Sequence, residues 1–193
     1  MKIAILGGTF NPPHFGHLFF ANEVRQKFGF DKIIFVPTYI SPHKQYSILS
    51  SSKDRLEMLK LATKDIPWAL VSDCDIKRGV ITRTVDTIDD INKLYNLTDK
   101  PSFIIGDDLA PTFHLWKNPK ELVEKANIII GVRENLSFDF KYSHSLIKNR
   151  VFPLSSSEIR ERVSSGLDID FLLPKEVIEY IRENGLYRSN SKD

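Results

Sequence analysis

The sequence predicts an α/β fold, a doubly wound parallel sheet followed by a small helical C-terminal part. Between residues 3 and 132, short apolar runs alternate with segments of helical periodicity. This alternation is typical of a parallel sheet covered by helices on both faces. Two of the runs, 3–6 and 102–105, end in glycine-containing loops. Because ligands bind such sheets beyond the carboxyl ends of their strands, we expect both loops to face one crevice.

Strands are expected where short apolar or β-branched runs are bounded by glycine, proline or polar residues. These runs are 3–6, 32–36, 68–72, 102–105 and 128–132. Helices are expected where apolar residues recur every three or four positions. These segments are 16–28, 54–63, 84–94 and 121–126.

The C-terminal part is expected to be helical. Ser155 followed by Glu158 fits a capping box that opens one helix. Pro174 begins a second helix, which runs towards Gly185. We therefore expect one domain over residues 1–188, with its helical part at about 155–188 and a flexible tail at 189–193.

The composition indicates a globular protein without a strong charge preference. The chain has 193 residues, 41% of them hydrophobic and 27% charged, with a net charge of +2. This balance argues against nucleic acid or an anionic membrane as the main partner. The single cysteine, Cys74, allows neither an internal disulfide nor a cysteine-based metal site. With no signal peptide or membrane-spanning run, we expect a cytoplasmic protein.

The segment from Gly7 to His17 carries the clearest chemical signal. A strand that enters two glycines and then a helix directs backbone N–H groups, and the positive end of the helix dipole, at one spot. His14 and His17 lie at the first turn of that helix. Two imidazoles placed there can donate hydrogen bonds to phosphate oxygens, which suits phosphoryl or nucleotidyl transfer.

Other interpretations of this segment are weaker. The two histidines could be zinc ligands, but no third ligand is evident nearby and the glutamate of a metalloprotease helix is missing. They could also be ordinary loop and cap residues. The segment contains neither the G-x-G-x-x-G dinucleotide fingerprint nor the Gly-Lys-Ser/Thr of a P-loop.

Two motifs resemble those of a known superfamily. Gly8 to His17, GTFNPPHFGH, resembles the G-T-F-[DN]-P-x-H-x-G-H signature of the nucleotidyltransferases. Leu154 to Arg160, LSSSEIR, is similar to their I-S-S-T-x-I-R motif, with Ser157 in place of threonine. Serine keeps the hydroxyl group, so this departure is mild. The resemblance implies a Rossmann-like nucleotidyltransferase fold.

The resemblance narrows to the bacterial nicotinate-nucleotide adenylyltransferases and covers essentially the whole chain. The supporting segments are 42–44, 83–87, 106–109 with Trp116, and 172–187. Asp107 departs from the pattern, because the family carries a small residue there. The implied reaction joins ATP and nicotinate mononucleotide to give deamido-NAD and pyrophosphate. Magnesium would arrive with the ATP, and no metal is expected to be held by the protein alone.

The resemblance also assigns roles to individual residues. The implied catalytic residues are His14, His17 and Arg160. The implied ATP-binding residues are Gly8, Thr9, Phe10, Lys44, Ile105, Gly106, Asp108, Ser156 and Ser157. The implied mononucleotide-binding residues are Thr84, Thr87 and Trp116. Whether nicotinate or nicotinamide mononucleotide is preferred stays open, as does self-association.

Several of these side chains also have ordinary structural explanations. Arg160 could be a surface arginine paired with a neighbouring glutamate, and Asp108 could only cap a helix. Trp116 could be a core residue, and Thr84 could cap its helix.

Three rival functions also remain. They are a related enzyme acting on pantetheine phosphate or using CTP, a non-catalytic nucleotide sensor, and a nicotinamide-dependent dehydrogenase. The chain length, Trp116 and the segment 83–87 speak against the first. A sensor need not keep His14, His17 and Arg160 together. The missing dinucleotide fingerprint disfavours the dehydrogenase.

Overall fold

The computed structural model describes residues 1–40, 50–132, 139–148, 150 and 152–189. At its centre lies a six-stranded sheet in the order β3-β2-β1-β4-β5-β6, in which every neighbouring pair is parallel. The strands are β1 (Ile3–Gly8), β2 (Lys32–Pro37), β3 (Ala69–Val71), β4 (Ser102–Gly106), β5 (Asn127–Val132) and β6 (His144–Lys148). This is the strand order of a doubly wound fold, which confirms the predicted class.

Helices connect the strands and continue beyond the sheet. They are α1 (Phe15–Phe28), α2 (Ser52–Thr63), α3 (Cys74–Arg78), α4 (Thr84–Tyr95), the 3-10 helix η1 (Ala110–Leu115), α5 (Pro119–Lys125), α6 (Ser156–Ser164) and α7 (Lys175–Glu183). All the strands and helices predicted from the sequence are present, with ends shifted by a few residues at most. Three elements were not predicted: α3, η1 and β6.

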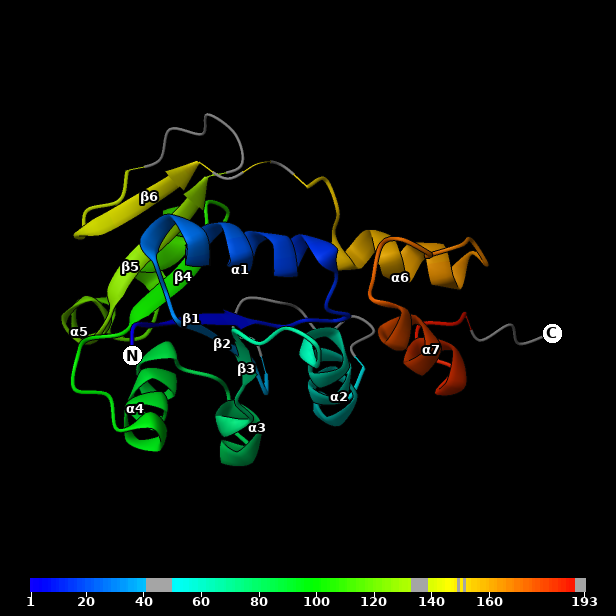
Figure 1. Cartoon of the computed structure of the whole chain (residues 1–193), viewed down its shortest axis with the longest axis horizontal. Coiled ribbons are helices and arrows are strands. Elements are labelled where there is room, and N and C mark those ends of the chain that lie inside the picture. Colours follow the sequence, from blue (N-terminus) through cyan, green and yellow to red (C-terminus); the bar gives the residue numbers. More distant parts are fainter. Residues whose placement is uncertain (41–49, 133–138, 149, 151, 190–193) are drawn as a thin grey trace.

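The sheet is covered on both faces, and strand alternation decides which residues face which layer. Ile3 and Ile5 of β1 pack with the apolar side of α4 and with α5. Ala4 and Leu6 point to the opposite face, where they pack with α1 and α2. Figure 1 shows α1 on one side of the sheet and α4 on the other.

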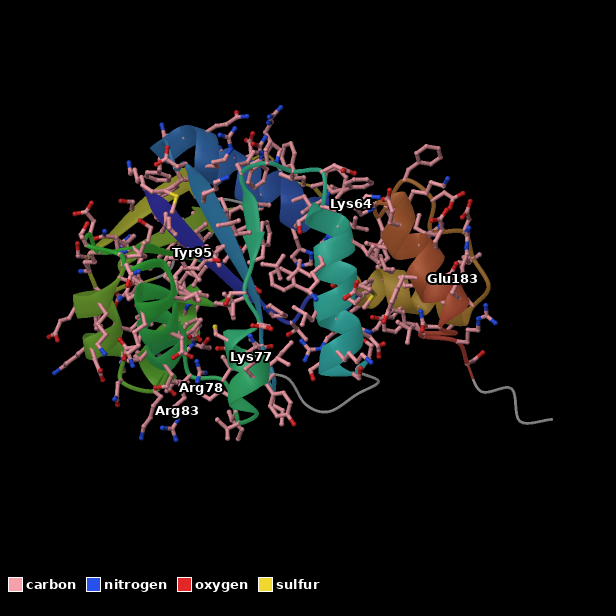
Figure 2. The ribbon with its side chains drawn as sticks, turned by 60° about the horizontal axis from the view of Figure 1, so that its bottom comes forward. Lys64, Lys77, Arg78, Arg83, Tyr95 and Glu183 are labelled. Carbon is pink, nitrogen blue, oxygen red and sulfur yellow. The ribbon has the colours of Figure 1, made fainter. Side chains whose placement is uncertain are left out.

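The C-terminal helices form a third apolar cluster on the outer side of α2. Met58 of α2 packs there with Ile159 of α6 and Val177 of α7, and all three are fully buried. Figure 2 shows α2 between the sheet and α7, with Lys64 at the end of α2. The Nζ of Lys64 lies 2.9 Å from a carboxylate oxygen of Glu176. This packing attaches α6 and α7 to the sheet through α2.

Helix caps match the sequence signals. The Oγ of Ser155 accepts a hydrogen bond from the Glu158 N–H at 3.1 Å at the beginning of α6, which is one of the two hydrogen bonds of the predicted capping box. Gly29 ends α1 in the left-handed conformation, with φ at 66°. Within the described ranges, no helix combines the length and apolar character needed to cross a bilayer.

Candidate active site

A cleft of about 400 Å³ lies at the carboxyl ends of β1 and β4. These neighbouring strands mark the point at which the strand order reverses, where doubly wound sheets bind their ligands. Both glycine-containing strand exits open into this one cleft, as expected from the sequence. The predicted site residues that line it are Gly8, Thr9, Phe10, His14, His17, Thr84, Thr87, Ile105, Gly106, Asp108, Trp116, Ser156 and Ser157. Lys44 lies outside the described residues.

The two histidines lie at the beginning of α1. His14 is the N-cap and His17 is one turn further, with their ring centroids 3.7 Å apart. The backbone N–H of His14 donates to Nδ1 of His17 at 3.2 Å. In a neutral His17 the proton is therefore on Nε2, which makes Nε2 a donor. The histidine pair is thus fixed by local backbone geometry.

The glycines of the motif are required by close side-chain contacts. A Cβ on Gly16 would lie 2.9 Å from Nδ1 of His14, and a Cβ on Gly8 would lie 2.9 Å from the Phe10 ring. Neither distance is tolerated without displacing the ring. Glycine therefore lets His14 and Phe10 approach the backbone next to the cleft.

The beginning of α6 forms a second wall. The Oγ of Ser156 donates to the carbonyl oxygen of Pro12 at 2.8 Å. Arg160 donates from Nη1 to the carbonyl oxygen of Asn11 at 2.8 Å and from Nη2 to Ser157 Oγ at 3.1 Å. Within the described residues Arg160 therefore contacts this wall and the loop after β1, and forms no ion pair with a glutamate. The catalytic role of Arg160 that the resemblance implies stays a prediction.

The exit of β4 separates two neighbouring carboxylates. Asp108 is exposed and lines the cleft with Ile105 and Gly106. Asp107, the departure from the family pattern, is only 2% exposed, and its N–H donates to the carbonyl oxygen of Gly131 at 3.0 Å. Asp108 is therefore the carboxylate of this pair that a ligand in the cleft can reach.

The predicted mononucleotide residues lie around the same cleft, at the beginning of α4 and after η1. The N-cap of α4 is Arg83, which makes Thr84 the first helical residue rather than the cap. The Thr87 N–H donates within the helix to the carbonyl oxygen of Arg83 at 3.1 Å. The backbone N–H groups that remain for a ligand are thus those at the very start of α4, near Thr84.

Trp116 is both a packed core residue and a cleft residue, the two interpretations that the sequence allowed. Its ring is half-buried and lines the cleft. It also packs 5.0 Å from the Phe113 ring and 6.4 Å from the Phe103 ring, measured between centroids. The core thus holds this aromatic surface at the cleft.

A buried acidic residue at the cleft was missed by sequence reasoning. Asp75 of α3 is 1% exposed and lines the cleft. Its Oδ1 accepts from Thr87 Oγ1 at 2.7 Å and from Arg78 Nη1 at 3.0 Å, and Arg78 also pairs with Asp90. Burial raises the pKa of Asp75, and the contacts with Thr87 and Arg78 oppose that rise. No local pattern distinguishes this aspartate from the other acids of the segment.

The fold and cleft are those of a nucleotidyltransferase, and a family model described as cytidylyltransferase-like matches residues 5–162. A probable nicotinate-nucleotide adenylyltransferase of Borrelia hermsii is 47% identical over 190 residues, covering 97% of this chain and 98% of the relative. Its counterpart in Dictyoglomus thermophilum is 42% identical, covering 97% and 100%. The chain therefore belongs to the nicotinate-nucleotide adenylyltransferase family.

Solved structures share the fold. A Plasmodium falciparum nicotinic acid mononucleotide adenylyltransferase complexed with NaAD matches with a TM-score of 0.79 and 22% identity, covering 96% of this chain and 97% of that one. The same protein complexed with APC matches with a TM-score of 0.75 and 21% identity, covering 96% of each chain.

Proposed function

We propose that this chain transfers AMP from ATP to nicotinate mononucleotide, giving deamido-NAD and pyrophosphate, as a step of NAD biosynthesis. The observation that carries the proposal is the cleft at the β1–β4 switch point, which the histidine pair, the beginning of α6 and Trp116 all line. The proposed partners are these two small molecules, without nucleic acid or membrane, and the proposed compartment is the cytoplasm.

The chemistry is an in-line displacement at the α-phosphorus of ATP. A phosphate oxygen of the mononucleotide forms the new bond to phosphorus as the bond to the bridging oxygen of pyrophosphate breaks. No side chain forms a covalent bond. The protein acts by positioning and by stabilising charge on the phosphate oxygens, as expected for this class of transfer.

Each part of the site has a task in this proposal. The Nε2–H of His17 and the imidazole of His14 stabilise the charge that develops around the α-phosphorus. Ser156, Ser157 and the N-terminal end of α6 bind the leaving pyrophosphate together with Arg160. Asp108 accepts hydrogen bonds from adenosine. Trp116 stacks on the pyridine ring, and the N-terminal end of α4 receives its carboxylate.

Magnesium fits the site as a companion of ATP. Across the described ranges, no group of three or more histidine, cysteine or acidic side chains is arranged to hold a metal. Of the cleft carboxylates, Asp75 accepts hydrogen bonds from Thr87 and Arg78, whereas Asp108 is exposed. Phosphate oxygens are the hard ligands that Mg²⁺ prefers, and the bound ion would neutralise part of their charge.

The test is direct. The protein is incubated with ATP, magnesium and either nicotinate or nicotinamide mononucleotide, and pyrophosphate and dinucleotide are measured. We expect both products with the nicotinate substrate. Parallel incubations with pantetheine phosphate, and with CTP in place of ATP, test the related activities. If pyrophosphate forms with neither mononucleotide, the proposal is refuted.

A further inference from the structure

Within the described residues, three backbone carbonyls of the loop between β1 and α1 accept side-chain hydrogen bonds. The Thr9 oxygen accepts from Arg55 Nη1 at 2.8 Å, the Asn11 oxygen from Arg160, and the Pro12 oxygen from Ser156. In a trans peptide the carbonyl and the following N–H point in opposite directions. The residues that follow Asn11 and Pro12 are prolines, which have no N–H. The Thr9–Phe10 peptide is thus the one whose N–H such a contact can orient.

Arg55 is an unusual residue to find behind this loop. It comes from α2 and is only 2% exposed. Its second terminal nitrogen, Nη2, donates to the carbonyl oxygen of Tyr39 at 2.9 Å, and its Nε finds no hydrogen-bond partner among the residues that the structure describes. Among the described residues, no carboxylate lies within 4.0 Å of its guanidinium nitrogens. Within the described part of the chain, the positive charge is therefore buried without an anionic partner.

A buried cation held only by neutral carbonyls is expensive to desolvate. Burial lowers the pKa of Arg55, but a guanidinium stays charged at neutral pH. An anion that enters the cleft would supply the missing compensation, since Thr9 and Phe10 line that cleft. The polyphosphate of ATP is such an anion.

We infer that Arg55 is a positioning residue for the nucleotide phosphates. It holds the Thr9–Phe10 peptide with the N–H directed away from the guanidinium, and it places a positive charge behind the loop. The inference rests on the proposed function, because it requires ATP to bind in the cleft. Arg55 itself touches no reacting atom.

The experiment compares ligands of different charge. Dissociation constants for ATP and adenosine are measured by calorimetry for the wild type, Arg55→Gln and Arg55→Lys, together with turnover and melting temperature. For Arg55→Gln we expect ATP binding about tenfold weaker, since a low-dielectric charge interaction of this kind is worth about one decade. Adenosine binding should change by less than about twofold, because adenosine carries no phosphate.

Arg55→Lys keeps the charge but loses the two-pronged contact with Thr9 and Tyr39. We expect it to retain most of the ATP preference over adenosine while turnover falls. If Arg55→Gln does not fold, Arg55→Lys still tests the inference. Unchanged turnover in Arg55→Lys would overturn the inference.

Two control variants test whether a change in ATP binding comes from the charge of Arg55, from weaker support of the loop, or from lower stability of the protein. Tyr187→Phe removes an uncharged contact with the same loop, the hydrogen bond from Tyr187 OH to Asn11 Oδ1 at 2.8 Å. Ile91→Ala creates a cavity on α4, on the face of the sheet opposite α1 and α2. Neither should change the ratio of ATP to adenosine affinity, although both should lower the melting temperature.

The outcomes are distinguishable. If Arg55→Gln weakens ATP and adenosine equally, Arg55 is only structural and the inference is wrong. If the wild type binds no ATP, the proposed function fails first. If the wild type binds ATP and Arg55→Gln keeps its preference for ATP over adenosine, only the inference fails.

Discussion

At the scale of single residues, the two imidazoles of the site are held differently. His14 is buried, at 6% exposed, and its backbone N–H fixes the ring of His17, which is half-buried at the cleft. The His17 ring is therefore positioned to contact a ligand in the cleft rather than to fill the core. Removing it should affect catalysis far more than folding.

We predict that His17→Ala lowers kcat by about 100-fold or more, the effect of losing one preorganised donor to a developing charge. The melting temperature should fall by only a few degrees, about the effect of a substitution at a half-buried position. Steady-state kinetics and thermal unfolding check both. His114→Ala, at an exposed histidine of η1, is the control and should leave both unchanged. Near-normal turnover in His17→Ala would contradict the proposed mechanism.

Gly16 provides a second residue-scale prediction. A methyl group there would lie 2.9 Å from His14 Nδ1, so Gly16→Ala must displace that ring. A displacement of about 1 Å at a reacting centre can cost about 100-fold, and we expect a loss of turnover of about tenfold to 100-fold. Gln26→Ala, at an exposed position of the same helix, serves as the control. Full activity in Gly16→Ala would show that the contact is not needed.

The sequence could identify residues with a local signature but not those defined by distant contacts. The motif predicted His14, His17 and Gly8, because strand, glycine and helix follow one another directly, whereas Asp108 was implied by the family resemblance. Arg55 lies in a polar stretch of α2, and nothing in its neighbourhood indicates that it is buried against a loop 46 positions earlier in the chain. Cys74 is half-buried, and burial raises the pKa of its thiol to about 11, which keeps the thiol protonated at neutral pH.

At the scale of elements, α3 contains a buried ion pair whose two members both contact α4, Asp75 through Thr87 and Arg78 through Asp90. Asp75 is 1% exposed and Arg78 has 21% of its side chain exposed, with 3.0 Å between Nη1 and Oδ1. Thr87 of α4 donates to the same carboxylate. Removing the arginine alone would leave a buried carboxylate without its cation, which is a costly arrangement.

We predict that Arg78→Met lowers the free energy of unfolding by about 3 kcal/mol at pH 7.5. This decrease in the free energy of unfolding should be smaller at pH 4 to 5 than at pH 7.5. Burial already raises the folded-state pKa of Asp75, and loss of the cation raises it further. For an acid with a raised folded-state pKa, stability is greatest below the unfolded pKa and is lost as pH rises through the folded one. Urea unfolding at several pH values measures this.

The control for this prediction lies on the same helix. Lys77 pairs with Asp73 at 3.1 Å, but its side chain is 76% exposed. Figure 2 shows Lys77 and Arg78 together at α3. Lys77→Met should leave unfolding unchanged at every pH, because exposed ion pairs contribute little. A loss in Arg78→Met that does not vary with pH would point to packing rather than to charge.

The elements missed from the sequence have identifiable reasons. β6 has four exposed residues of five, so it lacks the apolar run or alternation that predicts a strand. α3 has only five residues, too few for a helical repeat to appear. η1 contains Pro111 and is a 3-10 helix of six residues. Most of the predicted strands, namely β1, β2, β4 and β5, bury at least four residues each.

At the scale of the whole molecule, alternation of strands and helices predicted a parallel sheet and one shared crevice. The strand order could not be predicted in the same way, because β1 pairs with β4 across about 100 residues of chain. This pairing brings the loops after β1 and β4 together. The α6 wall is positioned through the third apolar cluster, by contacts of α2 with α6 and α7.

This arrangement predicts that a cavity under α6 lowers activity, whereas a cavity under α4 does not. Ile159 of α6 and Ile91 of α4 are both fully buried, so truncation of either to alanine should cost about 2–4 kcal/mol of stability. Ile159 precedes Arg160, and the helix that holds it contacts the loop through Ser156. Ile91 packs on the opposite face, about two turns from the end of α4 that lines the cleft.

Ile159→Ala should therefore raise the KM for ATP and lower kcat by about threefold to tenfold, since small displacements at a binding wall are costly. Ile91→Ala should keep wild-type kinetics despite a similar loss of stability. Both are assayed at a temperature at which unfolding curves show each variant fully folded. Equal kinetic losses in the two variants would mean that stability alone controls activity. An unchanged Ile159→Ala would mean that the third cluster does not position the wall.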